Sequence, residues 1–338
     1  MTIKILTAWL LCATALNPPP DEPLQIPFDH HVHVLSPTLV NHWRSAGMTF
    51  SRENRQYTDP LTFTAEQGIE RAFLISMAHV YATDEFGITA ETVPDKWAAL
   101  QQENDYVATC VAQSSGRFLG FFSVNPRDEK AIDEIERCRQ RPGMIGLKLH
   151  LPACGVSLDD PAHVAALKSV LEHCAKHNIA VLIHLASPNA GFGREQARRF
   201  WREIVALCPP IELYCAHLGG AGGYNEISEA VLREFIAIRE QLPSFDSKKI
   251  YFDLSGAILA EETDGIGPTP DDRCRALADI MRRVELQHFL FASDYPVFRP
   301  RAVLETLRLN LPLDKDELDR VLAQRSPRFE AAHPVDGT

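Results

Sequence analysis

The sequence predicts a single (β/α)8 barrel. Short apolar segments rich in β-branched and aromatic residues recur along the chain, and amphipathic segments lie between them. In the amphipathic segments, apolar residues are spaced three and four positions apart and charged residues occupy the opposite face. This alternation is typical of a parallel sheet that is covered by helices. A doubly wound open sheet is the alternative, because it produces the same alternation.

The number of apolar segments favours the barrel, because eight are present. The expected strands lie within residues 26–34, 69–79, 118–125, 144–151, 179–186, 211–220, 250–256 and 289–296. The clearest helical patterns cover residues 131–140, 164–177, 197–207, 229–242 and 272–285.

A chain of 338 residues could form one large barrel or two smaller domains. No low-complexity tract or interior linker divides it, so we expect one catalytic domain over residues 25–330 and a tail over 331–338. The connection over residues 34–66 is longer than a usual strand-to-helix loop. We expect it to cover the mouth of the barrel.

The first 24 residues read as a signal peptide followed by a proline-rich linker. Lys4 precedes an apolar run that ends in the small-x-small motif Ala13-Thr14-Ala15, which predicts a signal peptide over residues 1–15 and export or a periplasmic location. The run is too short to span a bilayer. A cytoplasmic location is the alternative, because the eight cysteines are scattered without a C-x-x-C pair, as reduced thiols are.

The charge of the chain restricts the class of partner. A net charge of −11 and a pI near 5.6 argue against nucleic acid and leave a small molecule as the expected partner. An anionic substrate remains compatible with this charge, because a bound metal ion would dominate the field near it.

The first expected strand contains FDHHVHV, which places three histidines within four positions. In a regular strand, Asp29, His31 and His33 lie on one face. Two imidazoles on one face can hold a divalent ion if other strands supply the remaining ligands.

Four later strands also end in polar residues of this kind. In a barrel, the carboxyl ends of the strands form the active site. The residues concerned are Lys148 and His150 on the fourth strand, His184 on the fifth, His217 on the sixth and Asp294 on the eighth. Neutral imidazoles and a carboxylate suit Zn²⁺ or another borderline divalent ion, which would lower the pKa of a bound water. Asp294 could then act as both ligand and general base.

This ordered set, with the segments GLKLHLP, VLIHLA, AHLGG and FASDYP, resembles the amidohydrolase superfamily, in particular its amidohydrolase-related, decarboxylase-like branch. The resemblance extends over nearly all of the expected domain. It implies five metal ligands, His31, His33, His184, His217 and Asp294. It places Lys148 where binuclear members carry a carbamate that bridges two metals.

Lys148 therefore has two interpretations. As an ammonium it cannot bind metal, so it is a ligand only if it is carbamylated. Otherwise it is an electrostatic clamp for a carboxylate or an oxyanion. One or two metal ions per chain are both compatible with the sequence.

The remaining site residues are predicted from their positions near strand ends. His150 is a candidate proton donor, substrate contact or replacement ligand, and Asp29 is expected to orient a ligand histidine. Candidate substrate contacts are His79 and Asn125 at the ends of the second and third strands, Arg194 for a substrate carboxylate, and Tyr224 in a glycine-rich loop.

The leading functional hypothesis is a metal-dependent hydrolase in which a metal-activated water attacks an ester, lactone or amide carbon, with catalytic roles for Asp294, His217 and His150. The alternative, which the resemblance also implies, is non-oxidative decarboxylation of a carboxylic acid or hydration of an unsaturated one. A minor alternative is a metal-binding barrel without catalytic activity. The resemblance further implies a possible homo-oligomer.

Overall fold

A computed structural model describes residues 26–46, 59–83, 88–187, 191–263 and 266–332. The expected signal peptide and linker and the final residues of the tail lie outside these ranges, so export stays a prediction. None of the described helices is long and apolar enough to cross a membrane.

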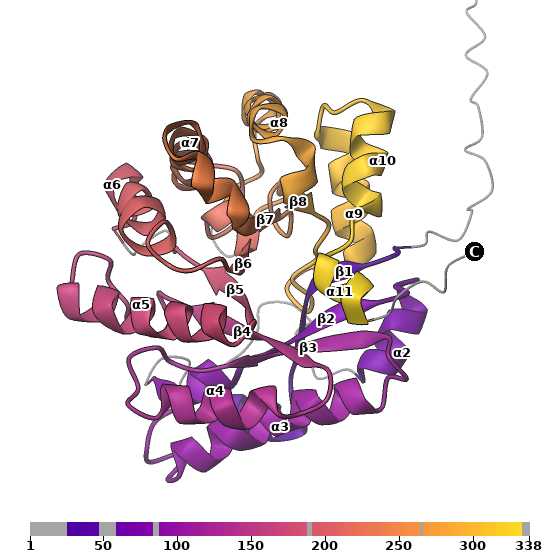
Figure 1. The fold of residues 1–338 in the computed structure, drawn as a ribbon. Coiled ribbons are helices and arrows are strands. Elements are labelled where there is room, and N and C mark those ends of the chain that lie inside the picture. Colours follow the sequence, from indigo (N-terminus) through magenta and orange to yellow (C-terminus); the bar gives the residue numbers. More distant parts are fainter. Residues whose placement is uncertain (1–25, 47–58, 84–87, 188–190, 264–265, 333–338) are drawn as a thin grey trace, which may run out of the picture.

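The described residues form a parallel sheet in which each strand pairs with the next one along the chain, as Figure 1 shows. The strands are β1 (Asp29–Val34), β2 (Ala72–Ser76), β3 (Phe118–Ser123), β4 (Met144–His150), β5 (Ala180–His184), β6 (Glu212–Cys215), β7 (Lys249–Asp253) and β8 (Phe289–Leu290). Each of them lies within an apolar segment of the sequence, apart from the first residue of β7.

The sheet closes between its first strand and the segment that follows its last strand. The backbone amide of His30 donates to the carbonyl of Phe291 at 3.1 Å, and that of His33 donates to the carbonyl of Tyr295 at 2.7 Å. Val32 and Tyr295 also form a parallel bridge. The (β/α)8 barrel is therefore confirmed, and the open doubly wound sheet is excluded.

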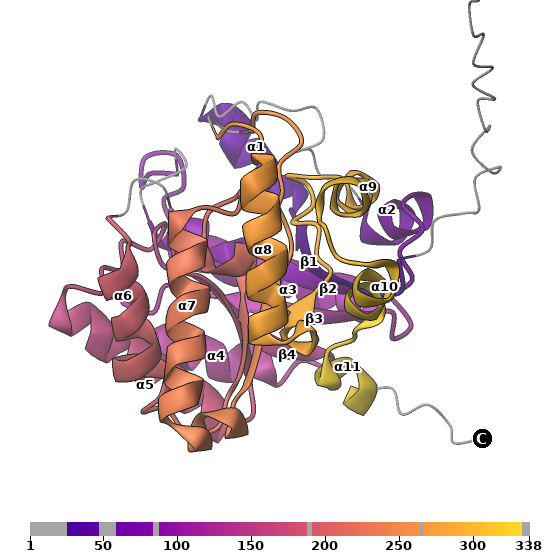
Figure 2. The ribbon, with the colours of Figure 1, turned by 90° about the horizontal axis from the view of Figure 1, so that it is seen from above.

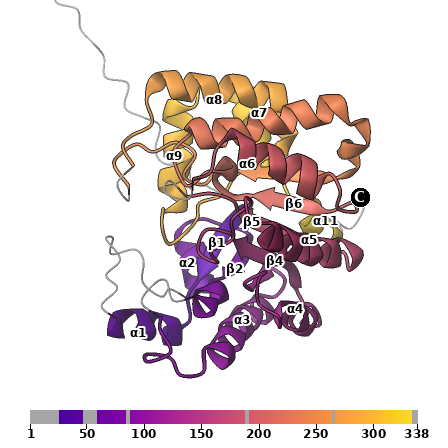
Figure 3. The same ribbon diagram turned by 90° about the vertical axis from the view of Figure 1, so that its left-hand side faces the viewer.

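Helices surround the strands, and consecutive helices such as α6, α7 and α8 lie side by side in Figure 2 and Figure 3. Most begin at a side-chain cap, as α5 does at Asp160 and α7 at Asn225. The helices are α1 (Pro37–Ser45), α2 (Pro60–Glu66), α3 (Lys96–Ala112), α4 (Ala131–Arg139), α5 (Pro161–Lys176), α6 (Arg194–Arg199), α7 (Glu226–Gln241), α8 (Asp271–Val284), α9 (Pro300–Asn310), α10 (Lys315–Ala323) and α11 (Pro327–Ala332).

The core has two layers that follow the alternation of side chains along the strands. One cluster fills the interior of the barrel and includes Phe73, Leu119, Leu182, Tyr214 and Leu290. A larger cluster lies between the strands and the helices. The interior cluster forms the floor on which the polar residues at the carboxyl ends of the strands rest.

The expected alternation along β1 is wrong at one point, because the strand contains a bulge. Asp29 pairs with Ala72 and Val32 pairs with Leu74, so His30 and His31 together face the single residue between Ala72 and Leu74. Both histidines therefore point to the interior, whereas a regular strand would send Asp29 and His31 to the same side.

The connection over residues 34–66 contributes α1 to the mouth of the barrel, while residues 47–58 lie outside the described ranges. The Ser36 hydroxyl caps α1 by accepting from the amide of Leu39. The amide of Ser36 donates to the buried carboxyl of Glu103 on α3 at 3.1 Å. Glu103 thus anchors the start of the helix that carries Trp43 to the mouth.

We predict a pH-dependent stabilisation by Glu103→Gln. Burial raises the pKa of Glu103 from 4.5 to about 7, so the folded state keeps a proton that the unfolded state has lost. Stability therefore falls as pH rises from about 4.5 to about 7, and Gln removes this loss. The free energy of unfolding of the variant minus that of wild type should therefore increase by about 3 kcal/mol from pH 5 to pH 8. Urea unfolding at both pH values measures the gain, and an equal difference at both values would contradict it.

Candidate metal centre

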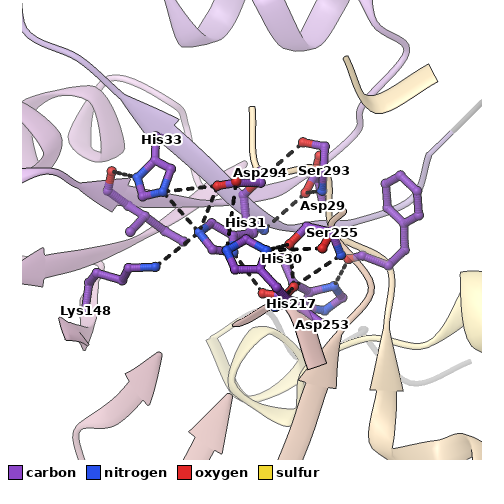
Figure 4. A network of polar contacts seen from close by, with 12 residues as sticks. Asp29, His30, His31, His33, Lys148, His217, Asp253, Ser255, Ser293 and Asp294 are labelled. Atoms are coloured by element: carbon purple, nitrogen blue, oxygen red, sulfur yellow. Dashed lines mark hydrogen bonds and ion pairs between the residues drawn. The ribbon is translucent and has the colours of Figure 1, made fainter. Parts of the chain in front are cut away.

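His31 and His33 bring their Nε2 atoms to 3.1 Å from each other at the carboxyl end of β1, as Figure 4 shows. His31 donates from Nδ1 to Asp253 Oδ2 at 2.8 Å, and His33 donates from Nδ1 to the carbonyl of Ile75 at 3.3 Å. These acceptors fix the proton of each ring on Nδ1. Each Nε2 therefore carries a lone pair that points toward the other ring.

The carboxylate of Asp294 completes a group of three acceptors. Its Oδ1 lies 3.3 Å from Nε2 of both His31 and His33. Burial lowers the pKa of His33 and lowers that of His31 to about 3, so both rings stay neutral. Three electron-rich atoms at this separation repel one another unless a cation lies among them. The donor set therefore fits a divalent metal ion.

Asp253, at the end of β7, was not identified from the sequence, and it organises the centre. Its Oδ2 accepts from His31, while its Oδ1 accepts from the backbone amides of His217 and Ser255 at 2.9 and 3.2 Å. One buried carboxylate thereby fixes a ring on β1 and the backbone after β6. Its position at the carboxyl end of the strand IYFDLSG was the available signal.

The backbone at two candidate catalytic positions is in the left-handed region. His217 has φ of 51° and Asp294 has φ of 61°, although neither is glycine. Such conformations cost about 1 to 3 kcal/mol each and persist where the surrounding structure enforces them. The bond from the His217 amide to Asp253 is one such restraint. The chain turns sharply at these points, and both side chains lie beside the β1 histidines.

His217 and His184 lie beside the centre, and each ring has one nitrogen that can accept. His217 Nδ1 lies 3.1 Å from the carbonyl of Ser255 and 2.8 Å from its hydroxyl, which leaves Nε2 as the acceptor, 3.9 Å from Asp294 Oδ2. His184 donates from Nε2 to the carbonyl of Ala186 at 2.7 Å, so its Nδ1 is the acceptor. The rings of His184 and His217 lie 4.9 Å apart.

His150 has the opposite orientation of proton and lone pair. Its Nδ1 accepts from the backbone amide of Ala153 at 3.2 Å, so in the neutral ring the proton is on Nε2. Burial lowers the pKa of His150 well below its ordinary value, which keeps the ring neutral. The ring stacks on His184 at 4.0 Å and lines the cavity above the centre. His150 therefore offers a hydrogen-bond donor on Nε2, whereas His184 and His217 offer acceptors.

Lys148 reaches the centre from β4, with Nζ 3.3 Å from His31 Nε2. Burial lowers the pKa of this lysine from 10.5 to about 8. The structure thus brings Lys148 into contact with a predicted ligand. Its two interpretations, a carbamate ligand and a cationic clamp, both remain predictions.

Asp29 acts on the centre through the backbone. Its Oδ1 accepts from the amide of His31 at 3.1 Å and from that of Ser293 at 3.0 Å. It therefore joins β1 to the segment that carries Asp294. The expectation that Asp29 shares the face of His31 is wrong, because the β1 bulge lies between them.

A cavity of about 300 Å³ opens above the candidate metal ligands. His33, His150, His184, His217 and Asp294 form its polar floor. Its walls are mainly apolar and include Leu35, Trp43, Met77, Leu259, Ile266 and Phe298. The volume is at the small end of the range for ligand sites, so the geometry suits a small molecule with an apolar body.

With this geometry established, comparison with known proteins identifies the family. The model of the amidohydrolase family matches residues 28–324, which is most of the chain. The chain belongs to the amidohydrolase family. This confirms the resemblance that the ordered motifs carry.

A curated relative and two solved structures are similar to this amidohydrolase. The relative is 2-amino-3-carboxymuconate-6-semialdehyde decarboxylase of Dictyostelium discoideum, 31% identical over 142 residues. That match covers 36% of this chain and only 38% of the relative.

The first structure is 5-carboxyvanillate decarboxylase from Novosphingobium aromaticivorans, complexed with manganese and 4-hydroxy-3-methoxy-5-nitrobenzoic acid. Its TM-score is 0.62 at 14% identity, over 93% of this chain and 97% of that one. The second is a probable 2-pyrone-4,6-dicarboxylic acid hydrolase from Acinetobacter baumannii with citric acid bound. Its TM-score is 0.56 at 15% identity, over 91% and 99% of the two chains. At these identities the structures establish the shared barrel fold alone.

The four predicted substrate contacts of this amidohydrolase, His79, Asn125, Arg194 and Tyr224, are not among the residues that line the cavity. His79 is fully buried and stacks on His150 at 5.3 Å, but its Nδ1 bonds to Ser123. Asn125 accepts from the amide of Arg127 and supports a turn.

Tyr224 and Arg194, the other two predicted substrate contacts, bind other parts of the protein. Tyr224 is packed in the large core cluster. The side chain of Arg194 is 85% exposed and pairs with Glu234 at 2.8 Å, so the structure does not bring it to the cavity. The prediction that Arg194 binds a substrate carboxylate therefore has no support in the geometry.

We predict that Asp253→Asn weakens metal binding without unfolding the barrel. The amide cannot accept on both sides, so either His31 or the His217 backbone loses its acceptor. The affinity for Zn²⁺ or Mn²⁺ should fall about 10- to 100-fold, measured by competition with a chelator. Asp246→Asn, at an exposed aspartate just before β7, is the matched control. Unchanged affinity in Asp253→Asn would contradict the positioning role.

Proposed function

We propose that this amidohydrolase is a metal-dependent decarboxylase of a small aromatic or unsaturated carboxylic acid. The observation that carries the proposal is the convergence of His31 Nε2, His33 Nε2 and Asp294 Oδ1 on one point beneath an apolar-walled cavity. The activity named for the curated relative, and that named for one structural neighbour, support the same reaction.

A divalent ion would be held by His31, His33 and Asp294, with His184 and His217 beside it. When bound, such an ion attracts a substrate carboxylate and withdraws electrons from it. Manganese is present in one structural neighbour, and the same nitrogen and oxygen donors also suit zinc. Zinc as the native ion remains a prediction.

The cavity walls position the body of the substrate. Trp43, Leu259 and Phe298 offer apolar surface to a planar ring or a conjugated chain and exclude water from it. A substrate whose acid group faces the polar floor therefore places its hydrocarbon part against these side chains. This arrangement fixes which end of the molecule meets the metal-ligating atoms.

Decarboxylation exchanges the carboxylate for hydrogen, so R–COO⁻ and one proton give R–H and CO₂. The protein must deliver that proton to the carbon that loses CO₂. His217 Nε2 and Asp294 Oδ2 lie 3.9 Å apart at the cavity floor, so this pair can hold a proton close to the substrate. We assign the proton delivery to these two residues.

His150 provides a hydrogen-bond donor to the same acid group. The other histidines at the cavity floor keep their lone pairs for the metal ion, whereas the neutral His150 ring carries an N–H on Nε2 that can donate to a carboxylate oxygen. Its rigid stacking on His184 fixes the direction of that donor. We assign to it the orientation of the substrate carboxylate.

Hydrolysis is the second candidate, because a structural neighbour is named as a probable hydrolase and Asp294 could accept the proton of an attacking water. The same centre serves both reactions. The activity named for the curated relative favours decarboxylation, and hydrolysis stays a prediction. The following assay distinguishes the two reactions.

We predict CO₂ release from at least one aromatic or unsaturated acid by metal-loaded enzyme. A panel that includes dihydroxybenzoates and 5-carboxyvanillate should give CO₂ and decarboxylated product in equal amounts. Removal of the metal should abolish turnover, and Asp294→Asn should lower it by at least about 100-fold with an unchanged circular dichroism spectrum. Turnover of esters or lactones without CO₂ would establish hydrolysis instead. Full activity of Asp294→Asn would refute its assigned role.

We predict that His150→Phe and His150→Gln differ in substrate binding. Phe keeps a ring against His184 but has no N–H, whereas the Gln amide can place a donor near the position of Nε2. KM for the acid that turns over should rise about 10- to 100-fold in His150→Phe, the cost of losing a hydrogen bond to a charged group. It should rise less in His150→Gln. Equal KM values in the two variants would contradict a donor role.

A further inference from the structure

Three side chains of the types that bind metal ions meet far from the barrel mouth, between α4 and α5. Nε2 of His173 lies 2.7 Å, and Nε2 of His177 3.9 Å, from Oε1 of Glu136. Within the described part of the chain, this is one of three groups whose ligand atoms lie within 4.8 Å of one another. The other two both contain His31 and belong to the central site.

The placement follows from the helical repeat. His173 and His177 are four residues apart at the end of α5, so their side chains lie on one face of the helix. The two rings have centroids 4.5 Å apart and are tilted by 32°. Glu136 lies in the last turns of α4, which runs beside α5 in Figure 1. Two rigid helices therefore supply the three ligands.

The carboxylate of Glu136 is already oriented for this purpose. Arg139, one turn later, holds its Oε2 with Nε at 2.8 Å and Nη2 at 2.6 Å. This leaves Oε1 facing the two imidazoles. The hydrogen bonds from Arg139 and His173 lower the pKa of Glu136 to about 2, so the group is ionised at neutral pH.

The position at the end of α5 also favours a cation. The last carbonyls of a helix carry partial negative charge, and His177 is the residue that caps α5. The three side chains are partly buried, between 19% and 35% exposed, so solvent can supply further ligands. The group thus combines two imidazole nitrogens, one carboxylate oxygen and open positions for water.

We propose that Glu136, His173 and His177 form a second, peripheral binding site for a borderline divalent transition-metal ion such as Zn²⁺, Ni²⁺ or Cu²⁺. Two imidazoles and a carboxylate are the donors that these ions prefer over Mg²⁺ or Ca²⁺. The site is independent of the proposed catalytic activity, because helices run antiparallel to strands and the ends of α4 and α5 therefore lie opposite the mouth.

A bound ion would cross-link α4 to α5 and stabilise the folded barrel by mass action. It would also add one equivalent to the metal content of the chain. A measured value of two ions per chain therefore does not by itself indicate a binuclear catalytic centre.

The decisive experiment is calorimetric titration of the metal-free full chain with Zn²⁺. Wild type should bind one equivalent of Zn²⁺ more than His173→Ala/His177→Ala, or bind that equivalent at least about 10-fold more tightly. Replacing a residue that merely supports a metal ligand already weakens binding about 10-fold, and replacing the ligands themselves should weaken it at least as much. His163→Ala, at another partly exposed histidine of α5, is the matched control and should behave as wild type. The double variant should keep the decarboxylase activity and its circular dichroism spectrum.

Two further measurements keep the outcome clear. Glu136→Gln, which keeps the size of the side chain, should lower the affinity for the same equivalent of Zn²⁺. With two equivalents of Cu²⁺, wild type should show a second nitrogen-ligated species by electron paramagnetic resonance, and this species should be missing from the spectrum of His173→Ala/His177→Ala. Identical stoichiometry and affinity in wild type and His173→Ala/His177→Ala would overturn the proposal. That result would leave the proposed catalytic function untouched.

Discussion

The contact between Asp253 and His31 is the interaction on which the central site depends. The buried carboxylate of Asp253 holds the proton of His31 on Nδ1. It also accepts a hydrogen bond from the backbone amide of His217. Without it, the ring of His31 could rotate or change tautomer, and the left-handed turn at His217 would lose its restraint. The candidate ligand atoms of two distant strands are thus oriented by one carboxylate that need not touch a metal or a substrate.

The sequence predicted the barrel well, because buried parallel strands and amphipathic helices leave strong periodic signals. It also predicted which strand ends carry His31, His33 and Asp294, since polar residues at the ends of apolar strands are conspicuous. The β1 bulge could not be predicted, because it is a property of the pairing with β2 and not of β1 alone. Local patterns likewise gave no sign that Glu234 would hold Arg194 away from the cavity.

The two ends of the barrel have different chemical characters. At the mouth, burial keeps imidazoles neutral and an apolar cavity lies over them. At the opposite end, Glu136 is ionised and shared between Arg139 and His173 at the surface. A metal ion would therefore meet a desolvated site at one end and a hydrated site at the other. The proposed catalytic site and the proposed stabilising site therefore lie at opposite ends of one fold.

The start of β1 also contacts the end of the chain. His30 points inward, where its Nε2 accepts a hydrogen bond from the amide of Ser326, and Phe28 packs against Phe329 with ring centroids 4.9 Å apart. A nascent chain that ends before Ser326 and Phe329 therefore lacks these partners of β1. A chain that ends before Asp294 also cannot offer the full set of predicted metal ligands.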